Sequence, residues 1–138
     1  MCLRRRFKGV RNYLVSAGAK ELILDLEERC CIRQLIFVVN MDDTTGTNES
    51  KVIIKIDEDE VLNESLINLW AKFAANITTS YRAAPFQFLK YDNTAKDYAF
   101  MILDLGRVER RFAIFFENKD TSNAAWLHCG VIYDILED

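Results

Sequence analysis

The residue types that most often carry nucleophilic catalysis or metal binding are scarce in this chain, which has one histidine and four cysteines. His128 directly precedes Cys129, and Cys30 directly precedes Cys31. Neighbouring side chains diverge by about 100° on a helix and about 180° on a strand, so His128 and Cys129 cannot form a base and nucleophile pair. Adjacent cysteines rarely bind one tetrahedral ion, and no CxxC spacing occurs. We therefore expect that the protein is not an enzyme and has no catalytic residues, metal site or cofactor.

Four consecutive acidic residues, 57–60, form the densest group of carboxylates. Paired carboxylates can act in acid–base catalysis, but a structural role fits this run better. Asp57 and Glu60 have the spacing of a capping box, and acidic side chains stabilise the N-terminus of a helix. Apolar residues then recur at helical spacing, which predicts a helix that starts at this run and buries one face. The apolar positions of this predicted helix are Leu62, Leu66, Leu69, Trp70, Phe73 and Ile77.

A third chemical feature is a pair of aromatic residues, Tyr98 and Phe100, in a segment that alternates like a strand (96–105). On a strand these rings share one face with Lys96 and stand about 7 Å apart. Nucleic-acid bases can stack on rings at such a spacing. Lys96 and Lys55 would then contact the phosphate backbone. This arrangement predicts a surface that binds single-stranded RNA.

Charge is distributed unevenly along the chain. Residues 1–20 contain six basic side chains and no acid, whereas residues 21–138 contain 12 basic and 21 acidic side chains. Such an asymmetry indicates a basic arm for an acidic partner. Apolar residues at helical spacing in this arm predict a short amphipathic helix that ends near Gly18. Its apolar stripe is Leu3, Phe7, Val10 and Leu14, and its basic residues are Arg4, Arg5, Arg6, Lys8 and Arg11.

The remaining elements follow from periodicity and from turn residues. Segment 107–119 fits either a helix or a strand, and we predict a helix because Gly106 breaks the chain just before it. Segment 21–26 alternates like a strand, although so short a run could also be helical. The polar stretch 41–50 is predicted to be a loop. The other predicted strands are 32–40, 51–57, a hairpin of 85–92 with 96–105, and the region around 131–135.

A resemblance to a known family arises from this order of elements. From residue 51 onward the predicted order is strand, helix, strand, strand, helix, strand. Within it, Lys96-Asp97-Tyr98-Ala99-Phe100-Met101-Ile102-Leu103 resembles the octamer motif of the RNA recognition motif family. Ile53 takes the place of the aromatic residue in that family's first-strand hexamer.

The resemblance covers about residues 51–136. It implies an α+β, ferredoxin-like domain at 51–138, with two helices packed on one face of the sheet. Residues 1–50 would then form an extension made of the basic N-terminal helix and additional strands, within one compact unit.

The resulting hypothesis is RNA binding by an aromatic sheet face and a basic N-terminal helix. The residues assigned to this nucleic-acid site are Tyr98, Phe100, Lys96, Lys55, Ile53, Arg4, Arg5, Arg6, Lys8 and Arg11. In the alternative, residues 1–50 cover the sheet, and Tyr98 and Phe100 lie in the core. The domain would then be a protein-interaction module, such as an adaptor, an inhibitor or a chaperone-like homodimer.

The cellular location is inferred from composition. No apolar run approaches the roughly 18 residues that a membrane span needs, and the N-terminus lacks the apolar core of a secretory signal. The cysteine spacing does not indicate a disulfide framework. We therefore expect no membrane partner and an intracellular location, in the cytoplasm or nucleus. An arginine-rich leader without acids also fits a mitochondrial presequence, which is the minor alternative.

Overall fold

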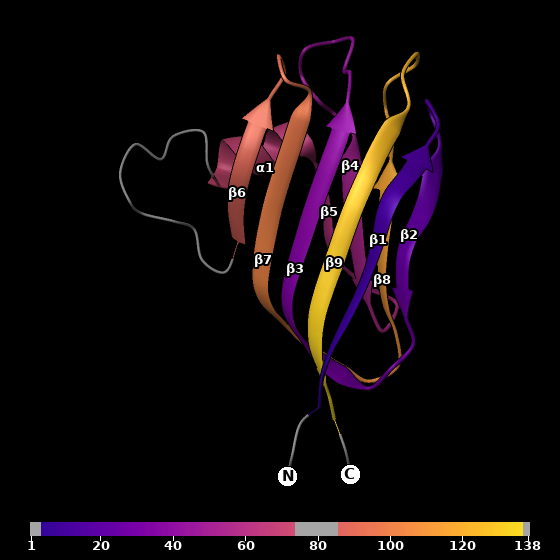
Figure 1. Cartoon of the computed structure of the whole chain (residues 1–138), viewed down its shortest axis with the longest axis vertical. Coiled ribbons are helices and arrows are strands. Elements are labelled where there is room, and N and C mark those ends of the chain that lie inside the picture. Colours follow the sequence, from indigo (N-terminus) through magenta and orange to yellow (C-terminus); the bar gives the residue numbers. More distant parts are fainter. Residues whose placement is uncertain (1–3, 74–85, 137–138) are drawn as a thin grey trace.

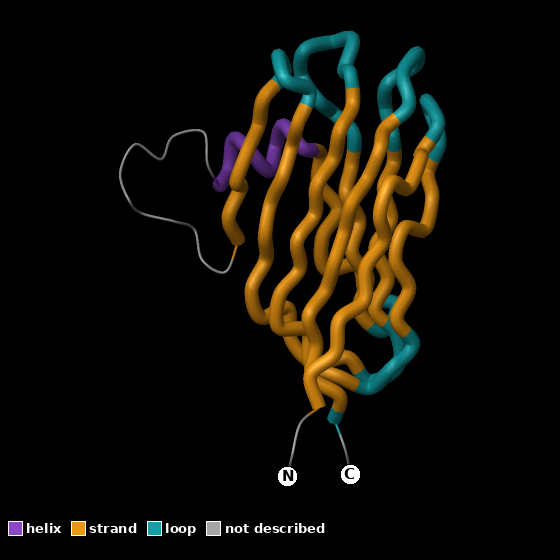
Figure 2. Tube along the Cα trace, viewed as in Figure 1, coloured by secondary structure: helices purple, strands orange, loops and turns teal. Residues whose placement is uncertain are grey.

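The computed structural model describes residues 4–73 and 86–136, which form two facing β-sheets and one short helix (Figure 1). Strands make up most of this part of the chain (Figure 2), so the predicted α+β class is wrong. In chain order the elements are β1 (Arg4–Val15), β2 (Lys20–Leu26), β3 (Cys30–Met41), β4 (Lys51–Ile56), β5 (Asp59–Ser65), α1 (Leu66–Phe73), β6 (Phe86–Asp92), β7 (Asp97–Val108), β8 (Phe112–Glu117) and β9 (Ala125–Ile135).

The order of the strands identifies the architecture. One sheet has five strands in the order β1-β9-β3-β7-β6, and the other has four in the order β2-β8-β4-β5. All paired strands run antiparallel. Consecutive strands from β1 to β4 alternate between the two sheets, as do β7, β8 and β9. With β6 set aside, this is the order of an eight-stranded jelly roll, a sandwich of two Greek keys.

The core lies between the two sheets and is built from side chains that alternate along each strand. Phe37 of β3 stacks on Phe100 of β7, with 5.1 Å between ring centroids. The Phe37 ring also lies 6.0 Å from that of Phe116, which belongs to β8 in the opposite sheet. All three rings are fully buried, and burial of each side chain stabilises the fold by about 1.5–3 kcal/mol. These rings therefore join the two sheets.

The predicted N-terminal helix is wrong, because residues 4–15 form the edge strand β1. β1 pairs with β9, and the register shifts between Val10 and Tyr13. Asn12 has a φ of 53°, a left-handed conformation that accommodates the extra residue of a β-bulge. Val10 and Tyr13 consequently both pack against the core although they are three residues apart. A bulged strand can thus show the apolar spacing of a helix.

The helix predicted from the acidic run is also largely wrong. Asp57 and Glu58 have φ values of 50° and 72° and connect β4 to β5 in a hairpin. Positive φ at both central residues is the geometry of a type I′ turn. The Asp57 carboxylate accepts hydrogen bonds from the backbone N–H groups of residues 109–111, so it does not cap a helix. Helix α1 begins only at Leu66, and the predicted continuation to Ile77 lies outside the described residues.

Segment 107–119 contains strand β8, not the predicted helix. Phe112, Ile114 and Phe116 alternate along β8, and each is 0% exposed. β8 lies between β2 and β4, which supply backbone hydrogen bonds on both of its sides. Because the first predicted helix is reduced to the short α1, the second is replaced by a strand, and the strands form two antiparallel sheets, the ferredoxin-like fold and the resemblance to the RNA recognition motif family are both contradicted.

Several strand predictions are confirmed. The segments predicted as strands at 21–26, 32–40 and 51–57 correspond to β2, β3 and β4, and the predicted hairpin corresponds to the pair β6 and β7. Strands from residues 1–50 and from residues 51–138 lie side by side: β3 is between β9 and β7, and β2 is beside β8. The two parts of the chain therefore share one core.

Candidate functional site

The two aromatic residues predicted to stack on RNA lie in the core. Tyr98 is 1% exposed and Phe100 is 0% exposed. They share one face of β7, as the alternation predicts, but that face points into the sandwich. The Phe100 ring stacks on Phe37 and Phe86, and the Tyr98 hydroxyl donates a hydrogen bond to the Asn93 side chain. Because neither ring can reach a base, the predicted stacking surface is absent.

The other sheet residues assigned to the RNA site are spread over the fold. Lys96 lies in the turn before β7, and its Nζ is 3.1 Å from Oδ2 of Asp42. Lys55 lies on β4 in the opposite sheet, where its Nζ is 5.5 Å from the centre of the Phe115 ring. Ile53, also on β4, is 3% exposed. These side chains therefore do not form one surface with β7.

The five basic residues of the predicted arm do lie together, exposed along the edge strand β1. Arg5 Nε is 3.0 Å from Oδ1 of Asp134 on β9, and Arg33 Nε on β3 is 2.7 Å from Oδ2 of the same carboxylate. Hydrogen bonds from the two guanidinium groups lower the pKa of Asp134 to about 2, although its burial opposes this shift. This cluster attaches the start of β1 to β9 and β3. The opposite edge of β1 pairs with no strand of the described chain.

Beside β1, the outer face of the five-stranded sheet has an apolar groove of about 280 Å³. Phe7 of β1 and Ile36 of β3 line it, with exposed fractions of 74% and 41%. Its floor contains Gly9 and Gly130, which lie opposite each other in β1 and β9, and Ile132 extends it along β9. The groove and the basic edge together form the clearest exposed surface for a macromolecular partner, and we call them the β1 surface.

The two glycines of the β1 surface have different roles. A Cβ on Gly9 would lie 2.9 Å from the carbonyl oxygen of Cys129, so Gly9 is required for the close approach of β1 to β9. A Cβ on Gly130 would meet nothing closer than 3.9 Å, so its missing side chain simply deepens the groove. Sequence reasoning misses this surface because a helical assignment places Phe7 and Gly9 on different faces. On a strand, positions 5, 7 and 9 share one face, and reading this segment as a strand is what could have revealed the surface.

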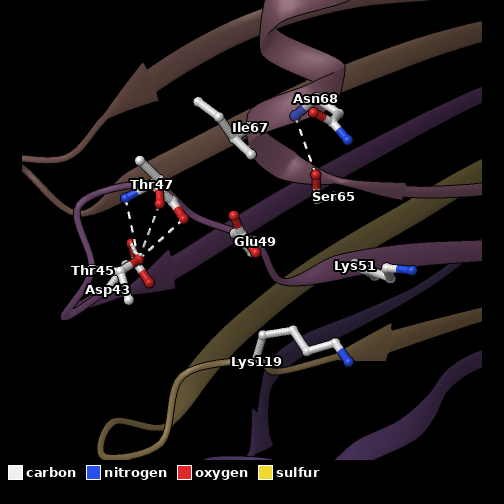
Figure 3. Close-up of a pocket in the computed structure, with 9 residues that line it drawn as sticks. All are labelled: Asp43, Thr45, Thr47, Glu49, Lys51, Ser65, Ile67, Asn68 and Lys119. Carbon is white, nitrogen blue, oxygen red and sulfur yellow. Dashed lines mark hydrogen bonds between the residues drawn. The ribbon is translucent and has the colours of Figure 1, made fainter.

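A larger and more polar pocket, of about 650 Å³, opens at the loop end of the sandwich (Figure 3). Its lining residues are Asp43, Thr45, Thr47, Glu49, Lys51, Ser65, Ile67, Asn68 and Lys119. The Thr45 hydroxyl donates to Oδ2 of Asp43 at 2.9 Å, and Oγ of Ser65 accepts the backbone N–H of Asn68 as the N-cap of α1. Two carboxylates and two lysines line the pocket, so neither sign of charge dominates. It contains no histidine or cysteine and gives no catalytic arrangement.

The loop that borders this pocket is anchored by Asp120, which is 2% exposed. The Asp120 carboxylate accepts hydrogen bonds from the backbone N–H and the hydroxyl of Thr44, at 2.9 and 2.7 Å. It also accepts the backbone N–H groups of Ser122 and Asn123. Burial raises the pKa of this carboxyl group, but the hydrogen bonds outweigh it and lower the pKa of Asp120 to about 2. The anion therefore holds two loops together.

Among the described residues, Cys30, Cys129 and His128 do not form a reactive site. Burial raises the pKa values of Cys30 and Cys129 to about 12, and a thiol with such a pKa is a poor nucleophile near neutral pH. The His128 ring accepts the backbone N–H of Asn12 at Nδ1. Within residues 4–73 and 86–136, no three His, Cys, Asp or Glu side chains gather as a metal site.

In the part of the chain that the structure describes, no helix combines the length and the apolar character that a membrane span requires.

Comparisons with known proteins give a fold and no family. No protein-family model matches the chain, and no curated protein matches it. Among solved structures, the crystal structure of dimeric latent PorU from Porphyromonas gingivalis is similar over 98% of this chain, with a TM-score of 0.55 and 7% sequence identity. The chain spans 13% of the length of that protein. At this identity the likeness concerns the fold alone, and function has to be argued from the site.

Proposed function

We propose that this protein is a protein-interaction module that binds an extended, acidic and apolar segment of a partner along strand β1. The observation that carries the proposal is an exposed edge strand with five basic residues and no acid, next to an apolar groove. The sequence raises a protein-interaction module as an alternative, and the exposure of the β1 surface supports it.

The backbone of β1 supplies the first reason. An edge strand presents unpaired N–H and C=O groups, and an extended segment can join the sheet by bonding to them. β1 is 12 residues long and pairs with a strand of the described chain on one side only. Its basic side chains favour an acidic segment over a neutral or basic one, because charges of opposite sign on adjacent strands attract.

The apolar groove favours a peptide over a nucleic acid. Phe7 stands among the basic residues and is 74% exposed. A nucleic acid could place phosphates on the arginines and a base on Phe7, but the aliphatic side chains of Ile36 and Ile132 in the groove offer no stacking surface, and the predicted stacking rings are buried. Side chains of an extended peptide alternate in direction, so acidic residues could meet the arginines while apolar residues cover Phe7.

The test measures binding of a labelled, capped peptide of alternating glutamate and valine to the full chain by fluorescence anisotropy. We expect Phe7→Ser to weaken binding about tenfold, because loss of an apolar anchor costs somewhat more than 1 kcal/mol. Gly130→Val should also weaken binding, because it fills the groove with little strain. The matched control is Leu89→Ser, since Leu89 is 53% exposed on β6, at the other edge of the same sheet.

Two results would contradict the proposal. The first is equal peptide affinity for wild type and Phe7→Ser in proteins with the same circular dichroism spectrum. The second uses mixed-sequence single-stranded RNA in place of the peptide. If the RNA binds in a salt-dependent manner while the peptide does not bind, the basic strand serves nucleic acid instead.

A further inference from the structure

The charges of the two sheets point to one particular partner. We infer that the segment bound at β1 is strand β5 of a second copy of this chain, so that molecules associate head to tail. The inference rests on the proposed function, because it names the partner of the same β1 surface.

The first observation is the charge of the four sheet edges. β1 contains five basic residues and no acid, whereas β5 contains three acidic residues and no base. The acidic residues of β5 are Asp59, Glu60 and Glu64. The other two edge strands, β2 and β6, each contain both basic and acidic residues. Within the described chain, β1 and β5 are therefore the two edges with charge of a single sign, and their signs are opposite.

The second observation is that each of the two edge strands, β1 and β5, carries an exposed apolar side chain among its charged residues. In β5, the side chains of Asp59, Glu60 and Val61 are exposed, with Val61 at 50%. The register of β5 against β4 shifts beside Val61, between the pairs made by Ile54 and Lys55. β5 thus has the composition expected for the β1 ligand, which is acidic side chains beside an exposed apolar one. Phe7, at 74% exposure, is the corresponding apolar residue of β1.

Charge disfavours the symmetric pairings. Two β1 strands side by side would gain no attraction between unlike charges and, paired antiparallel about their midpoint, would bring Lys8 against Arg11. Two β5 strands paired in the same way would bring Glu60 against Glu64. The unlike pair of β1 with β5 places opposite charges on adjacent strands. The charges therefore select a heterologous contact between copies.

The positions of the two edge strands in the fold determine which kind of assembly such a contact forms. β1 lies at one end of its sheet and contacts β2, whereas β5 lies at the far end of the other sheet, beside α1. A contact between β1 of one copy and β5 of the next leaves a free β5 on the first and a free β1 on the second. Head-to-tail contacts of this kind form rings when the rotation closes and filaments when it does not.

The experiment uses charge reversal in the full chain. One variant carries Arg6→Glu, Lys8→Glu and Arg11→Glu on β1, which changes the charge of that strand from +5 to −1. The other carries Asp59→Lys and Glu60→Lys on β5, which changes the charge of that strand from −3 to +1. Both changes are at exposed positions, so the fold should persist, which circular dichroism and thermal unfolding will verify. The matched control for the β5 variant is Glu27→Lys with Glu49→Lys, which changes net charge equally at exposed loop positions.

Sedimentation velocity over a range of concentrations and salt gives the readout. We expect the mass of the wild type to rise with concentration beyond two chains and to fall with added salt, because surface charges are screened. Each reversal variant alone should need at least tenfold more protein to associate, while the control behaves as wild type. An equimolar mixture of the two variants should associate again, since reversed β1 edges fit reversed β5 edges and the unchanged edges fit each other.

Each contrary result is informative. A wild type that stays monomeric, or stops at two chains, would overturn the head-to-tail inference. So would reversal variants that associate normally, or a mixture that does not associate. If the glutamate–valine peptide still binds the β1 surface in these cases, the proposed function stands and only the identity of the partner is wrong. Absence of both peptide binding and association would remove both conclusions.

Discussion

Phe100 and Phe7 carry the same side chain in opposite surroundings. Phe100 is fully buried, and its ring lies 5.1 Å from those of Phe37 and Phe86 and 5.9 Å from that of Phe88. Phe7 is 74% exposed on the outer face of the sheet. Aromatic pairs add about 0.5–1.5 kcal/mol beyond burial, so Phe100 contributes to stability, whereas Phe7 is available to a partner.

Alanine substitution at these two positions should separate stability from binding. Phe100→Ala leaves a cavity among three rings and should lower the free energy of unfolding by about 3–5 kcal/mol. Phe7→Ala should change it by less than about 0.5 kcal/mol, because the ring has few contacts to lose. Urea unfolding followed by tryptophan fluorescence measures both. A loss of several kcal/mol in Phe7→Ala would mean that this ring is buried in the folded protein.

At the scale of elements, the turn between β4 and β5 combines an unfavourable backbone conformation with hydrogen bonds to a segment distant in sequence. Asp57 and Glu58 both have positive φ, which is unfavourable for residues with a Cβ. The Asp57 carboxylate gains three backbone hydrogen bonds from residues 109–111, and these lower its pKa. Glu58 makes a 3.6 Å contact with Arg111 through an exposed carboxylate. Asp57 therefore compensates for its conformation more fully than Glu58 does.

Glycine at position 58 should consequently stabilise the protein. Glu58→Gly removes the steric cost of φ 72° and should raise the free energy of unfolding by about 0.5–1 kcal/mol, since the exposed ion pair contributes little. The comparison is Glu60→Gly in the neighbouring strand, where glycine should destabilise by about 0.5–1 kcal/mol. Thermal unfolding measures both. If both variants lose stability equally, position 58 does not have turn geometry in solution.

The same elements show what the sequence can predict. Runs of β-branched and aromatic residues, such as those of β3 and β7, gave correct strands and a correct shared face for Tyr98 and Phe100. The sequence left open whether that face is exposed or lies in the core, because the answer depends on β8, which could also be a helix from its sequence. The bulge at Asn12 gave β1 a helical apolar spacing. The groups that donate hydrogen bonds to Asp57 are at least 52 residues away in sequence. Only its spacing to Glu60 was therefore visible, and that spacing favoured a capping box.

The candidate site was predictable in part. The charge asymmetry of the first twenty residues located the basic segment that lies on β1. The groove was not predictable, because it needs Gly9 and Gly130 to lie opposite each other in strands at the two ends of the chain. The acidic residues of β5 were visible in sequence, but their exposure on a sheet edge depends on the hairpin at Asp57.

At the scale of the whole molecule, carboxylates connect segments that are distant in sequence. Asp134 joins β9 to Arg5 of β1 and Arg33 of β3, and Asp120 joins the loop after β8 to Thr44. The carboxyl groups whose pKa values are lowered in the fold are Asp57, Glu64, Asp92, Glu109, Asp120 and Asp134. The folded state therefore binds fewer protons than the unfolded state in acid.

Acid should consequently unfold the protein over a defined range of pH. A group whose folded pKa is lowered contributes its full stability above its ordinary pKa and loses it as the pH falls through the folded value. For Asp120 and Asp134 that range runs from the ordinary value of 3.8 down to about 2. We expect the urea midpoint to be nearly constant from neutral pH to about 5 and to fall steeply from about 4 to 2.

Substitution of one anchoring carboxylate tests this origin of acid sensitivity. Asp134→Asn removes the charge that Arg5 and Arg33 bind. The variant should therefore have a lower free energy of unfolding at pH 7, and that free energy should depend less steeply on pH below 4. Glu49→Gln, at an exposed loop position, should follow the wild-type curve. Parallel curves for wild type and Asp134→Asn would mean that this carboxylate titrates alike in the folded and unfolded chains. In that case the attachment of β1 to the sheet would rest on backbone pairing with β9, and the edge would remain in place when Asp134 is neutral.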